Sequence, residues 1–230
     1  MPEPEAPGQR AVVLLSGGLD SSTVTAYASS KGWKIVAVSF DYGQNHPTEL
    51  EAARIQGARQ EVVEHIIAHV DLRPVGGSAL VGSAPVPKDR DGETMAEDIP
   101  ITYVPARNAI FLAYGVAVAE ARGLTHLFIG ANSVDYSGYP DCRPGFLQSF
   151  QRTAALATKT GVEGHPVHIH APLLSLSKAD IVRLASRLGV DLAHTWTCYD
   201  PIDGHPCGHC DACQLRAKGF AEAGVIDPLQ

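Results

Sequence analysis

The chain lacks the features that mark membrane and secreted proteins. Nowhere in its 230 residues is there an apolar run of the roughly 20 residues that a membrane-spanning helix needs. Its first residues, MPEPEAPGQR, are acidic and rich in proline, whereas a secretory signal starts with basic residues and continues with an apolar stretch. These absences predict a cytoplasmic protein that does not contact a membrane.

Positive charge is also sparse. Lys and Arg number 18 against 25 Asp and Glu, the formal net charge is −7, and no basic run occurs. Because such a chain has no long-range field to attract a polyanion, we expect a small substrate and no direct binding of nucleic acid. With 45% hydrophobic residues, the chain can bury the core of an ordinary globular enzyme.

The cysteines are few and unevenly placed. Four of the five lie in CYDPIDGHPCGHCDAC, which is unlike the disulfide framework of a secreted protein. Four thiolates at this spacing suit a closed, structural Zn²⁺ site, with an iron–sulfur cluster or redox-active CxxC pairs as alternatives. For Cys142, outside the cluster, we expect a buried, unreactive thiol, a catalytic nucleophile being the alternative. The predicted metal ligands are Cys198, Cys207, Cys210 and Cys213.

Apolar, β-branched runs alternate with segments of helical spacing. The expected strands are 11–15, 35–40, 65–70, 126–131 and 167–173, and the expected helices between them are 22–30, 47–62, 107–122 and 145–159. This alternation predicts an α/β fold with a doubly wound, mainly parallel five-stranded sheet, whose ligands bind beyond the carboxyl ends of the strands.

The last part of the chain has a different pattern. Ser177 and Asp180 form a capping box that opens a helix, which Gly189 ends. No regular pattern then resumes until residues 211–224, so we divide the chain into an α/β domain, 11–190, and a small C-terminal zinc-binding appendage, 191–230. Residues 74–105 are rich in Gly, Pro, Ser and acid, and predict an exposed excursion that is either a lid or a spacer.

The string SGGLDSS, residues 16–22, stands between the first expected strand and a helix. Its glycines let the backbone approach a phosphate, its serines add donors, and the helix start offers unpaired N–H groups and a positive dipole end. A plain glycine turn would explain the glycines but not the flanking serines. The string matches neither GxxxxGK[ST] nor GxGxxG, which disfavours γ-phosphoryl transfer and hydride transfer.

SGGLDSS resembles the signature of the PP-loop ATP pyrophosphatases, which hold the pyrophosphate released when a substrate oxygen attacks the α-phosphorus of ATP. The resemblance makes Ser16 and Asp20 candidate catalytic residues. Asp20 would help to place Mg²⁺, with an N-cap role as the alternative. The implied nucleotide-binding segment is Leu15, Ser16, Gly17, Gly18, Leu19, Asp20, Ser21, Ser22, Thr23, Val24 and Thr25.

Four further strings narrow the resemblance. They are FDYGQNHPTEL (40–50), VPARNAIFL (104–112), GANSVDYSGYPDCRPGF (130–146) and TWTCYDPIDGHPCGHCDACQLRAKGF (195–220). With SGGLDSS they resemble the 7-cyano-7-deazaguanine synthase family of queuosine biosynthesis along nearly the whole chain. The resemblance implies an adenine nucleotide alpha hydrolase-like fold.

That family converts 7-carboxy-7-deazaguanine and ammonia into the 7-cyano compound at the expense of ATP. Adenylation activates the carboxylate, ammonia displaces AMP to leave an amide, and a second adenylation permits elimination to the nitrile. The resemblance therefore implies ATP with Mg²⁺ as co-substrate, release of AMP and pyrophosphate, and structural Zn²⁺; we also expect a homodimer. No residue stands out as a general base, so positioning and charge stabilisation would supply most of the rate.

A flat heterocycle is recognised by aromatic faces and paired donors and acceptors. The loop after the fourth expected strand supplies such groups, and the start of a helix offers Arg107, also a catalytic candidate, to hold a carboxylate or phosphate. The predicted substrate-binding residues are Arg107, Asn108, Asp135, Tyr136, Tyr139, Asp141 and Arg143. After the second strand, Asp41, Tyr42 and Gln44 contact ATP or substrate unless they form an ordinary turn.

Three other functions fit the sequence less well. A tRNA thiolase of the PP-loop class would use the cysteines for sulfur transfer, but it would need a basic RNA-binding extension. An ammonia-dependent synthetase for another carboxylate, such as the one that completes NAD, would not need the cysteine appendage or the SGYPDCR loop. The intact SGGLDSS string argues against a non-catalytic nucleotide sensor.

Overall fold

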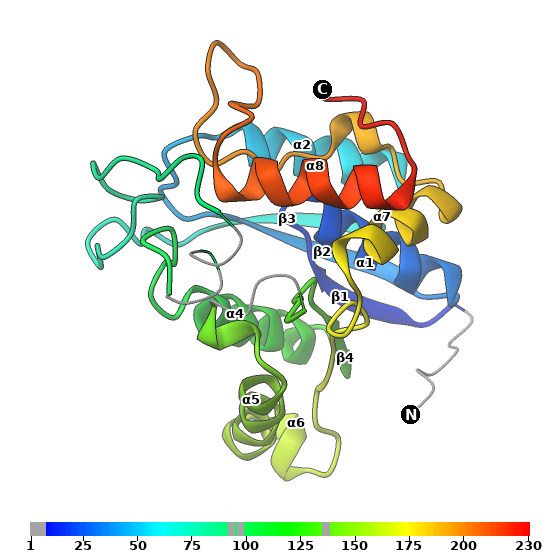
Figure 1. Cartoon of the computed structure of the whole chain (residues 1–230). Coiled ribbons are helices and arrows are strands. Elements are labelled where there is room, and N and C mark those ends of the chain that lie inside the picture. Colours follow the sequence, from blue (N-terminus) through cyan, green and yellow to red (C-terminus); the bar gives the residue numbers. More distant parts are fainter. Residues whose placement is uncertain (1–7, 92–94, 96–98, 135–138) are drawn as a thin grey trace.

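The computed structural model describes residues 8–91, 95, 99–134 and 139–230. Its centre is a five-stranded sheet in the order β3-β2-β1-β4-β5, in which every neighbouring pair is parallel (Figure 1). The strands are β1 (Arg10–Leu14), β2 (Lys34–Asp41), β3 (Glu64–His69), β4 (His126–Phe128) and β5 (His168–His170). The predicted parallel α/β fold is confirmed, and β4 and β5 are shorter than the sequence indicated.

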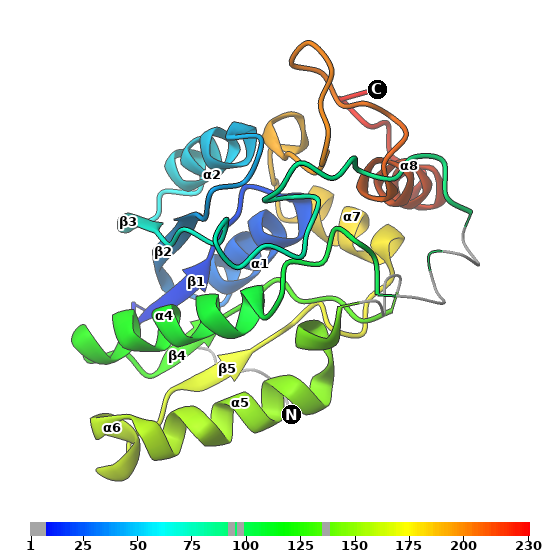
Figure 2. The same ribbon diagram turned by 90° about the vertical axis from the view of Figure 1, so that its left-hand side faces the viewer.

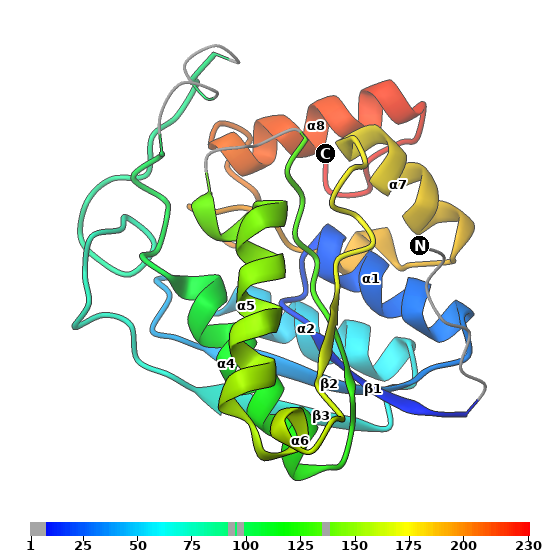
Figure 3. The same cartoon turned by 90° about the horizontal axis from the view of Figure 1, so that it is seen from below.

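Helices cover both faces of the sheet. Figure 2 shows α1, α2 and α7 on one face with α8 beyond them, and Figure 3 shows α4 and α5 lying across the other. The helices are α1 (Leu19–Ser30), α2 (Thr48–Arg59), α4 (Arg107–Ala121), α5 (Pro144–Ala157), α6 (Lys159–Val162), α7 (Lys178–Arg187) and α8 (Asp211–Ala223), with short 3₁₀ turns η1 (Pro140–Cys142) and η2 (Leu192–His194). None of these described helices is long and apolar enough to cross a membrane.

The helices on both faces of the sheet explain why β1 is a continuous apolar run. Successive side chains of a strand point to opposite faces of its sheet. Val12 and Leu14 join the core beneath α4 and α5, whereas Ala11 and Val13 join the core beneath α1 and α7. Because both faces are buried, the central strand needs apolar residues throughout rather than an alternating pattern.

The strand order reverses between β1 and β4. From β1 the sheet grows outward through β2 to β3, and α4 then returns the chain to β4 on the other side of β1. The loops that follow β1 and β4 therefore diverge, which leaves a crevice at the carboxyl edge of the sheet. In open α/β sheets this switch point is where ligands bind.

The C-terminal part of the chain is packed against α7. The predicted capping box is present, since the Ser177 hydroxyl accepts a hydrogen bond from the Asp180 N–H at 3.1 Å. Residues after η2 are held by the buried Arg216, which donates to the Asp227 carboxylate at 2.7 Å and to the Thr195 hydroxyl at 2.9 Å. The domain boundary at residue 191 stays a prediction.

The segment 74–105 differs in part from its expected form. Its backbone is irregular, as predicted, but residues 79–81 are buried, so the expectation of an exposed excursion was wrong for them. The carbonyls of two of them are satisfied by Asn45, whose backbone donates to Leu80 and whose side chain donates to Ala79. An apolar triplet with paired backbone groups can be buried without a helix or a strand.

Gly17 lies where α2 packs against the loop after β1. Its φ is +82°, and a Cβ there would lie 2.4 Å from the Ala53 nitrogen and 2.5 Å from the Glu49 carbonyl oxygen. By contrast, Gly123 has a φ of +64°, and a Cβ at that residue would meet nothing within 4 Å. A residue with a Cβ would have a strained backbone at either position, but only in place of Gly17 would it also meet a steric conflict.

We predict that Gly17→Ala lowers the free energy of unfolding much more than Gly123→Ala does. A positive φ alone costs an alanine roughly 1 kcal/mol, and overpacking adds roughly 1–3 kcal/mol. Urea denaturation of both variants measures the difference. Equal losses would contradict the close packing of α2 on the loop.

Candidate active site

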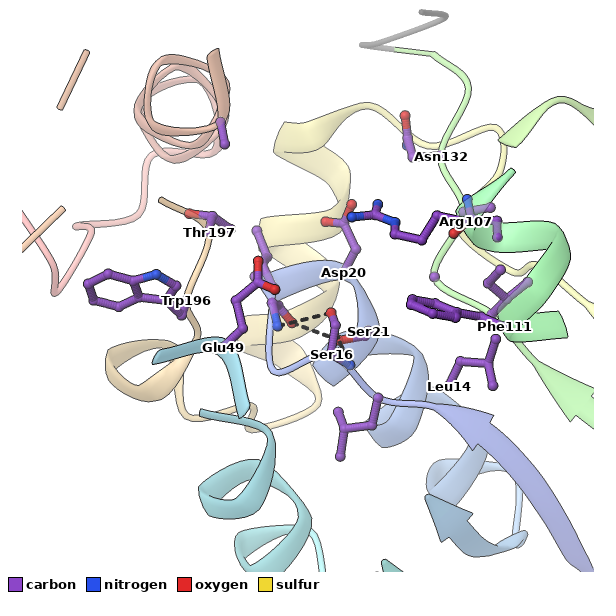
Figure 4. A pocket seen from close by; sticks show the side chains of 18 of the residues that line it. Leu14, Ser16, Asp20, Ser21, Glu49, Arg107, Phe111, Asn132, Trp196 and Thr197 are labelled. Atoms are coloured by element: carbon purple, nitrogen blue, oxygen red, sulfur yellow. Dashed lines mark hydrogen bonds between the residues drawn. The ribbon is translucent and has the colours of Figure 1, made fainter. Parts of the chain in front are cut away.

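A cavity of about 290 Å³ opens at the carboxyl edge of the sheet (Figure 4). Its wall includes the loop after β1, the residues that follow β4, and the first turns of α1, α4, α7 and α8. Its volume is near the lower end of the range for ligand pockets, roughly 300 Å³. The cavity therefore occupies the switch point at which the fold is expected to bind a ligand.

The loop after β1 is held by its own serines. The Ser16 N–H donates to the Ser21 hydroxyl at 3.1 Å, and the two hydroxyls lie 3.0 Å apart. Gly18 is the N-cap of α1, and its carbonyl accepts from Ser21. The loop thus presents hydroxyls and the start of a helix to the cavity, as an anion site requires.

Only part of the predicted nucleotide-binding segment lines this cavity. Leu15, Ser16, Gly18, Leu19, Asp20 and Ser21 line it. Gly17 lies beneath, and the buried residues 22–25 belong to the packing of α1. The hydroxyls of Thr23 and Thr25 donate to backbone carbonyls one turn earlier, which explains their burial. Nucleotide contacts by residues 22–25 stay a prediction.

Asp20 is paired with a lysine that the sequence patterns did not single out. The Lys178 ammonium lies 2.8 Å from both carboxylate oxygens of Asp20. Lys178 directly follows the N-cap Ser177, and α7 begins at the same edge of the sheet as α1. Lys178 could have been recognised in the sequence as a lysine in the first turn of a helix that follows a parallel strand.

Arg107 begins α4 beside an aromatic ring. Its guanidinium carbon lies 5.7 Å from the centroid of the Tyr42 ring, and Nη1 donates to the Tyr42 hydroxyl at 3.4 Å. Burial raises the pKa of Tyr42 to about 12, so this hydroxyl stays neutral at physiological pH. Arg107 remains cationic, because a guanidinium does not lose its proton in this pH range.

The predicted substrate-binding residues divide into three groups. Arg107, Asn108 and Tyr139 line the cavity, as do Tyr42 and Gln44 from the turn after β2. Asp141 is instead buried beneath the start of α4, where its carboxylate accepts the Asn108 N–H at 2.9 Å.

Two of the remaining candidates, Arg143 and Asp41, do not line the cavity. Arg143 is exposed at the start of α5, and Asp41 binds His69 at 3.2 Å. Asp135 and Tyr136 lie outside the described residues. Substrate contacts by Asp141, Arg143, Asp135 and Tyr136 stay predictions.

Two further cavity residues lie in the strings that carried the family resemblance, yet neither was singled out. Phe111 is one helical turn after Arg107, and its ring stacks on Phe40 with centroids 3.9 Å apart. Glu49 is in the first turn of α2, where burial raises the pKa of its carboxyl group. Spacing of four residues on a helix was a usable signal for Phe111.

The four C-terminal cysteines form one cluster. Cys198, Cys207, Cys210 and Cys213 are all buried, and their sulfurs lie within 4.8 Å of one another. Backbone N–H groups of Cys207 and Cys210 donate to sulfurs of the cluster at 3.2 and 3.3 Å. Four converging sulfurs, two of which accept these backbone hydrogen bonds, are consistent with a metal site.

The cysteine cluster is tied to the cavity. Trp196 donates its backbone N–H to the Gly17 carbonyl at 2.9 Å and its indole N–H to the Cys198 carbonyl at 3.1 Å. On the other side, Asp211 lines the cavity and binds Arg90 at 2.9 Å. The cluster therefore supports one wall of the cavity.

Comparison with known proteins shows the family of the chain. Residues 10–224 match the family model described as "Queuosine biosynthesis protein QueC". A 7-cyano-7-deazaguanine synthase from Anaeromyxobacter dehalogenans (strain 2CP-C) is 56% identical over 223 residues, covering 96% of this chain and 95% of the relative. The chain belongs to this family. The resemblance inferred from its five strings is confirmed, and with it the conclusion that the chain is an enzyme.

A second relative belongs to the same family, and a solved structure shares the fold. A 7-cyano-7-deazaguanine synthase from Kineococcus radiotolerans is 56% identical over 220 residues, covering 95% of this chain and 96% of the relative. Among solved structures, NMN synthetase from Francisella tularensis has a TM-score of 0.51 and 17% identity, covering 96% of this chain and 79% of that chain. The latter likeness shows a shared fold alone.

In this QueC-family chain the fifth cysteine, Cys142, is buried at the wall of the main cavity. Burial raises the pKa of Cys142 to about 12, and its sulfur accepts a hydrogen bond from the Asn108 side chain at 3.2 Å. Since the thiolate is the nucleophilic form, this environment favours the unreactive thiol.

We predict that Cys142 resists iodoacetamide in the native protein. With a pKa of about 12, only roughly one Cys142 in ten thousand is a thiolate at about pH 8. Mass mapping of labelled peptides should find Cys142 unmodified under native conditions and modified in guanidinium. Rapid native labelling would mean that the thiol is activated.

Proposed function

We propose that this protein converts 7-carboxy-7-deazaguanine and ammonia into 7-cyano-7-deazaguanine, using ATP and releasing AMP and pyrophosphate. The observation that carries this proposal is the convergence of the first turns of α1, α4 and α7, with Arg107 and Lys178, on one cavity. Helix N-termini and fixed cations bind anions, and the reaction has to bring a triphosphate and a carboxylate together.

The phosphate loop would hold the leaving group. Ser16, Ser21 and the N–H groups that begin α1 face the cavity and can donate to pyrophosphate. Asp20 would hold Mg²⁺, a hard ion that prefers carboxylate and phosphate oxygens and that neutralises phosphate charge. Lys178, which binds Asp20 directly, would then contact a phosphate oxygen.

The opposite wall would hold the heterocycle. Arg107 and Asn108 can orient the carboxylate, while Phe111 and Tyr42 offer ring faces to a flat substrate. Once the carboxylate oxygen is held near the α-phosphorus, its attack forms the adenylate and displaces pyrophosphate. Ammonia then displaces AMP, and a second adenylation of the amide oxygen leads to the nitrile. Positioning and charge stabilisation supply the rate.

The cysteine cluster would hold a structural Zn²⁺. Four thiolates make a closed tetrahedral site, with no position left for a reacting water. A role in sulfur transfer is disfavoured because all four sulfurs belong to the same buried cluster.

The use of ATP is our reason to expect the reaction in the cytoplasm, and a homodimer remains part of the proposal.

Measuring AMP per nitrile tests the proposed reaction. We expect about two AMP from the carboxylic acid and about one from the synthetic amide, because each oxygen removed needs one adenylation in the same site. Ammonia should support the reaction and glutamine should not. A nitrile yield from glutamine alone, or an amide that is not converted, would contradict the mechanism.

For the cluster we predict a single Zn²⁺ per chain that is lost in Cys210→Ser. Removing one of four ligands opens the site, and losing the metal should lower the thermal midpoint of unfolding by several degrees, since each roughly 1 kcal/mol shifts it by about 2–4 °C. Elemental analysis and thermal melting measure both effects. Cys142→Ser, outside the cluster, should keep its zinc. Iron in the purified protein would contradict the assignment.

A further inference from the structure

A second, smaller pocket adjoins the main cavity. Its volume of about 20 Å³ is enough for a single molecule the size of water. Four residues line both spaces, namely Tyr42, Gln44, Glu49 and Tyr199. We call this space the side pocket. It is too small for any part of a nucleotide or a heterocycle, but its size suits ammonia.

Glu49 is the acid at the junction of the two spaces. Asp20 and Asp211, the other cavity acids, are paired with Lys178 and Arg90 at 2.8 and 2.9 Å. Within the described part of the chain, no hydrogen bond or ion pair holds the Glu49 side chain. Figure 4 shows its carboxyl group pointing into the cavity. Glu49 is therefore able to bind a cation that arrives from solution.

The charged and titratable groups around Glu49 differ between the main cavity and the side pocket. Toward the main cavity its charged neighbour is Arg107, beside the neutral Tyr42 hydroxyl, and burial raises the pKa of Glu49 while Arg107 lowers it. In the side pocket the other titratable residues besides Tyr42 are His46, Tyr199 and the cluster residue Cys198, and His46 lies 3.9 Å from Asp200. Asp200 in turn binds Lys88 at 2.8 Å.

Asn45 adds a hydrogen-bond acceptor to the side pocket. Its amide nitrogen donates to the Ala79 and Gly82 carbonyls at 3.0 and 3.1 Å, which uses both of its hydrogens. The side-chain oxygen of Asn45 thus remains as an acceptor for the N–H groups of a bound cation. Carboxylate and amide oxygens are acceptors of the kind that suit ammonium, and Glu49 and Asn45 both line this water-sized space.

We propose that the side pocket binds ammonium and that Glu49 removes one of its protons, so that ammonia enters the main cavity next to the adenylate. This inference rests on the proposed function. The proton passes from the ammonium nitrogen to a Glu49 oxygen, and the freed nitrogen lone pair attacks the carbonyl carbon. The C–N bond forms, the C–O bond to AMP breaks, and the second nitrogen proton passes to the departing phosphate. Glu49 returns its proton to water.

The test compares Glu49→Gln with Glu51→Gln, a matched change at an exposed position on the same helix. Exchange of labelled pyrophosphate into ATP, dependent on 7-carboxy-7-deazaguanine, reports adenylation, which needs no ammonia. We expect Glu49→Gln to keep this exchange and to raise the KM for ammonium at neutral pH about tenfold or more, since a hydrogen bond to a charged group is lost. Glu51→Gln should behave as wild type.

Two further readouts separate proton removal from a structural effect. The rate of Glu49→Gln should recover as pH rises, because free ammonia then becomes abundant without a base. Hydroxylamine, which is largely neutral at neutral pH, should trap the adenylate as the hydroxamate equally well in both variants.

The inference would be overturned if Glu49→Gln abolished pyrophosphate exchange, or if exchange persisted while the KM for ammonium stayed unchanged. The first result would assign Glu49 to magnesium or nucleotide binding. Failure of the wild-type protein to catalyse the exchange would overturn the proposed function itself, and this inference with it.

Discussion

The close approach of α2 to the phosphate loop at Gly17 is the contact on which the rest of the site depends. A side chain at this position would collide with the backbone of Glu49 and Ala53. Its absence lets the first turn of α2, with Glu49, reach the same cavity as the loop. The Gly17 carbonyl also accepts the N–H of Trp196, so the cysteine cluster is fixed to the loop through the same residue. The candidate phosphate loop, Glu49 and the cluster are thus held in one geometry.

The cysteine cluster explains how irregular chain can form a wall of an active site. Residues around it have few regular backbone hydrogen bonds of their own, and a bound metal would replace them with ligand bonds. The segment 78–91 is in turn fixed to the cluster segment. Asp89 donates its N–H to the His209 carbonyl, and Arg90 binds Asp211. A change at the cluster should therefore be transmitted to the cavity through packing, without any chemical role for the metal.

Much of the fold could be predicted because it depends on local patterns. Apolar runs gave the strands, and the capping box at Ser177 gave the start of α7. The phosphate loop was recognisable because its residues are contiguous. Lys178 and Glu49 were missed because their importance comes from distant elements: Lys178 matters through Asp20, and Glu49 through a glycine on another loop. The sequence does not reveal that Asp141 lies beneath the start of α4, and a substrate contact by Asp141 stays a prediction.

The charged side chains that line the cavity balance one another, unlike those of the whole chain, since Asp20, Glu49 and Asp211 stand against Arg107, Lys178 and Arg216. This balance constrains what Glu49 can do. The chain carries −7 overall, yet helix N-termini, Arg107 and Lys178 face the site and favour anions. A lone carboxylate there would repel an incoming triphosphate, and burial already favours its neutral form. A bound ammonium ion removes the conflict, since it neutralises Glu49 while ATP binds. After proton transfer both partners are neutral, so Glu49 is compatible with the phosphates at each stage only if the cation reaches it from the side pocket.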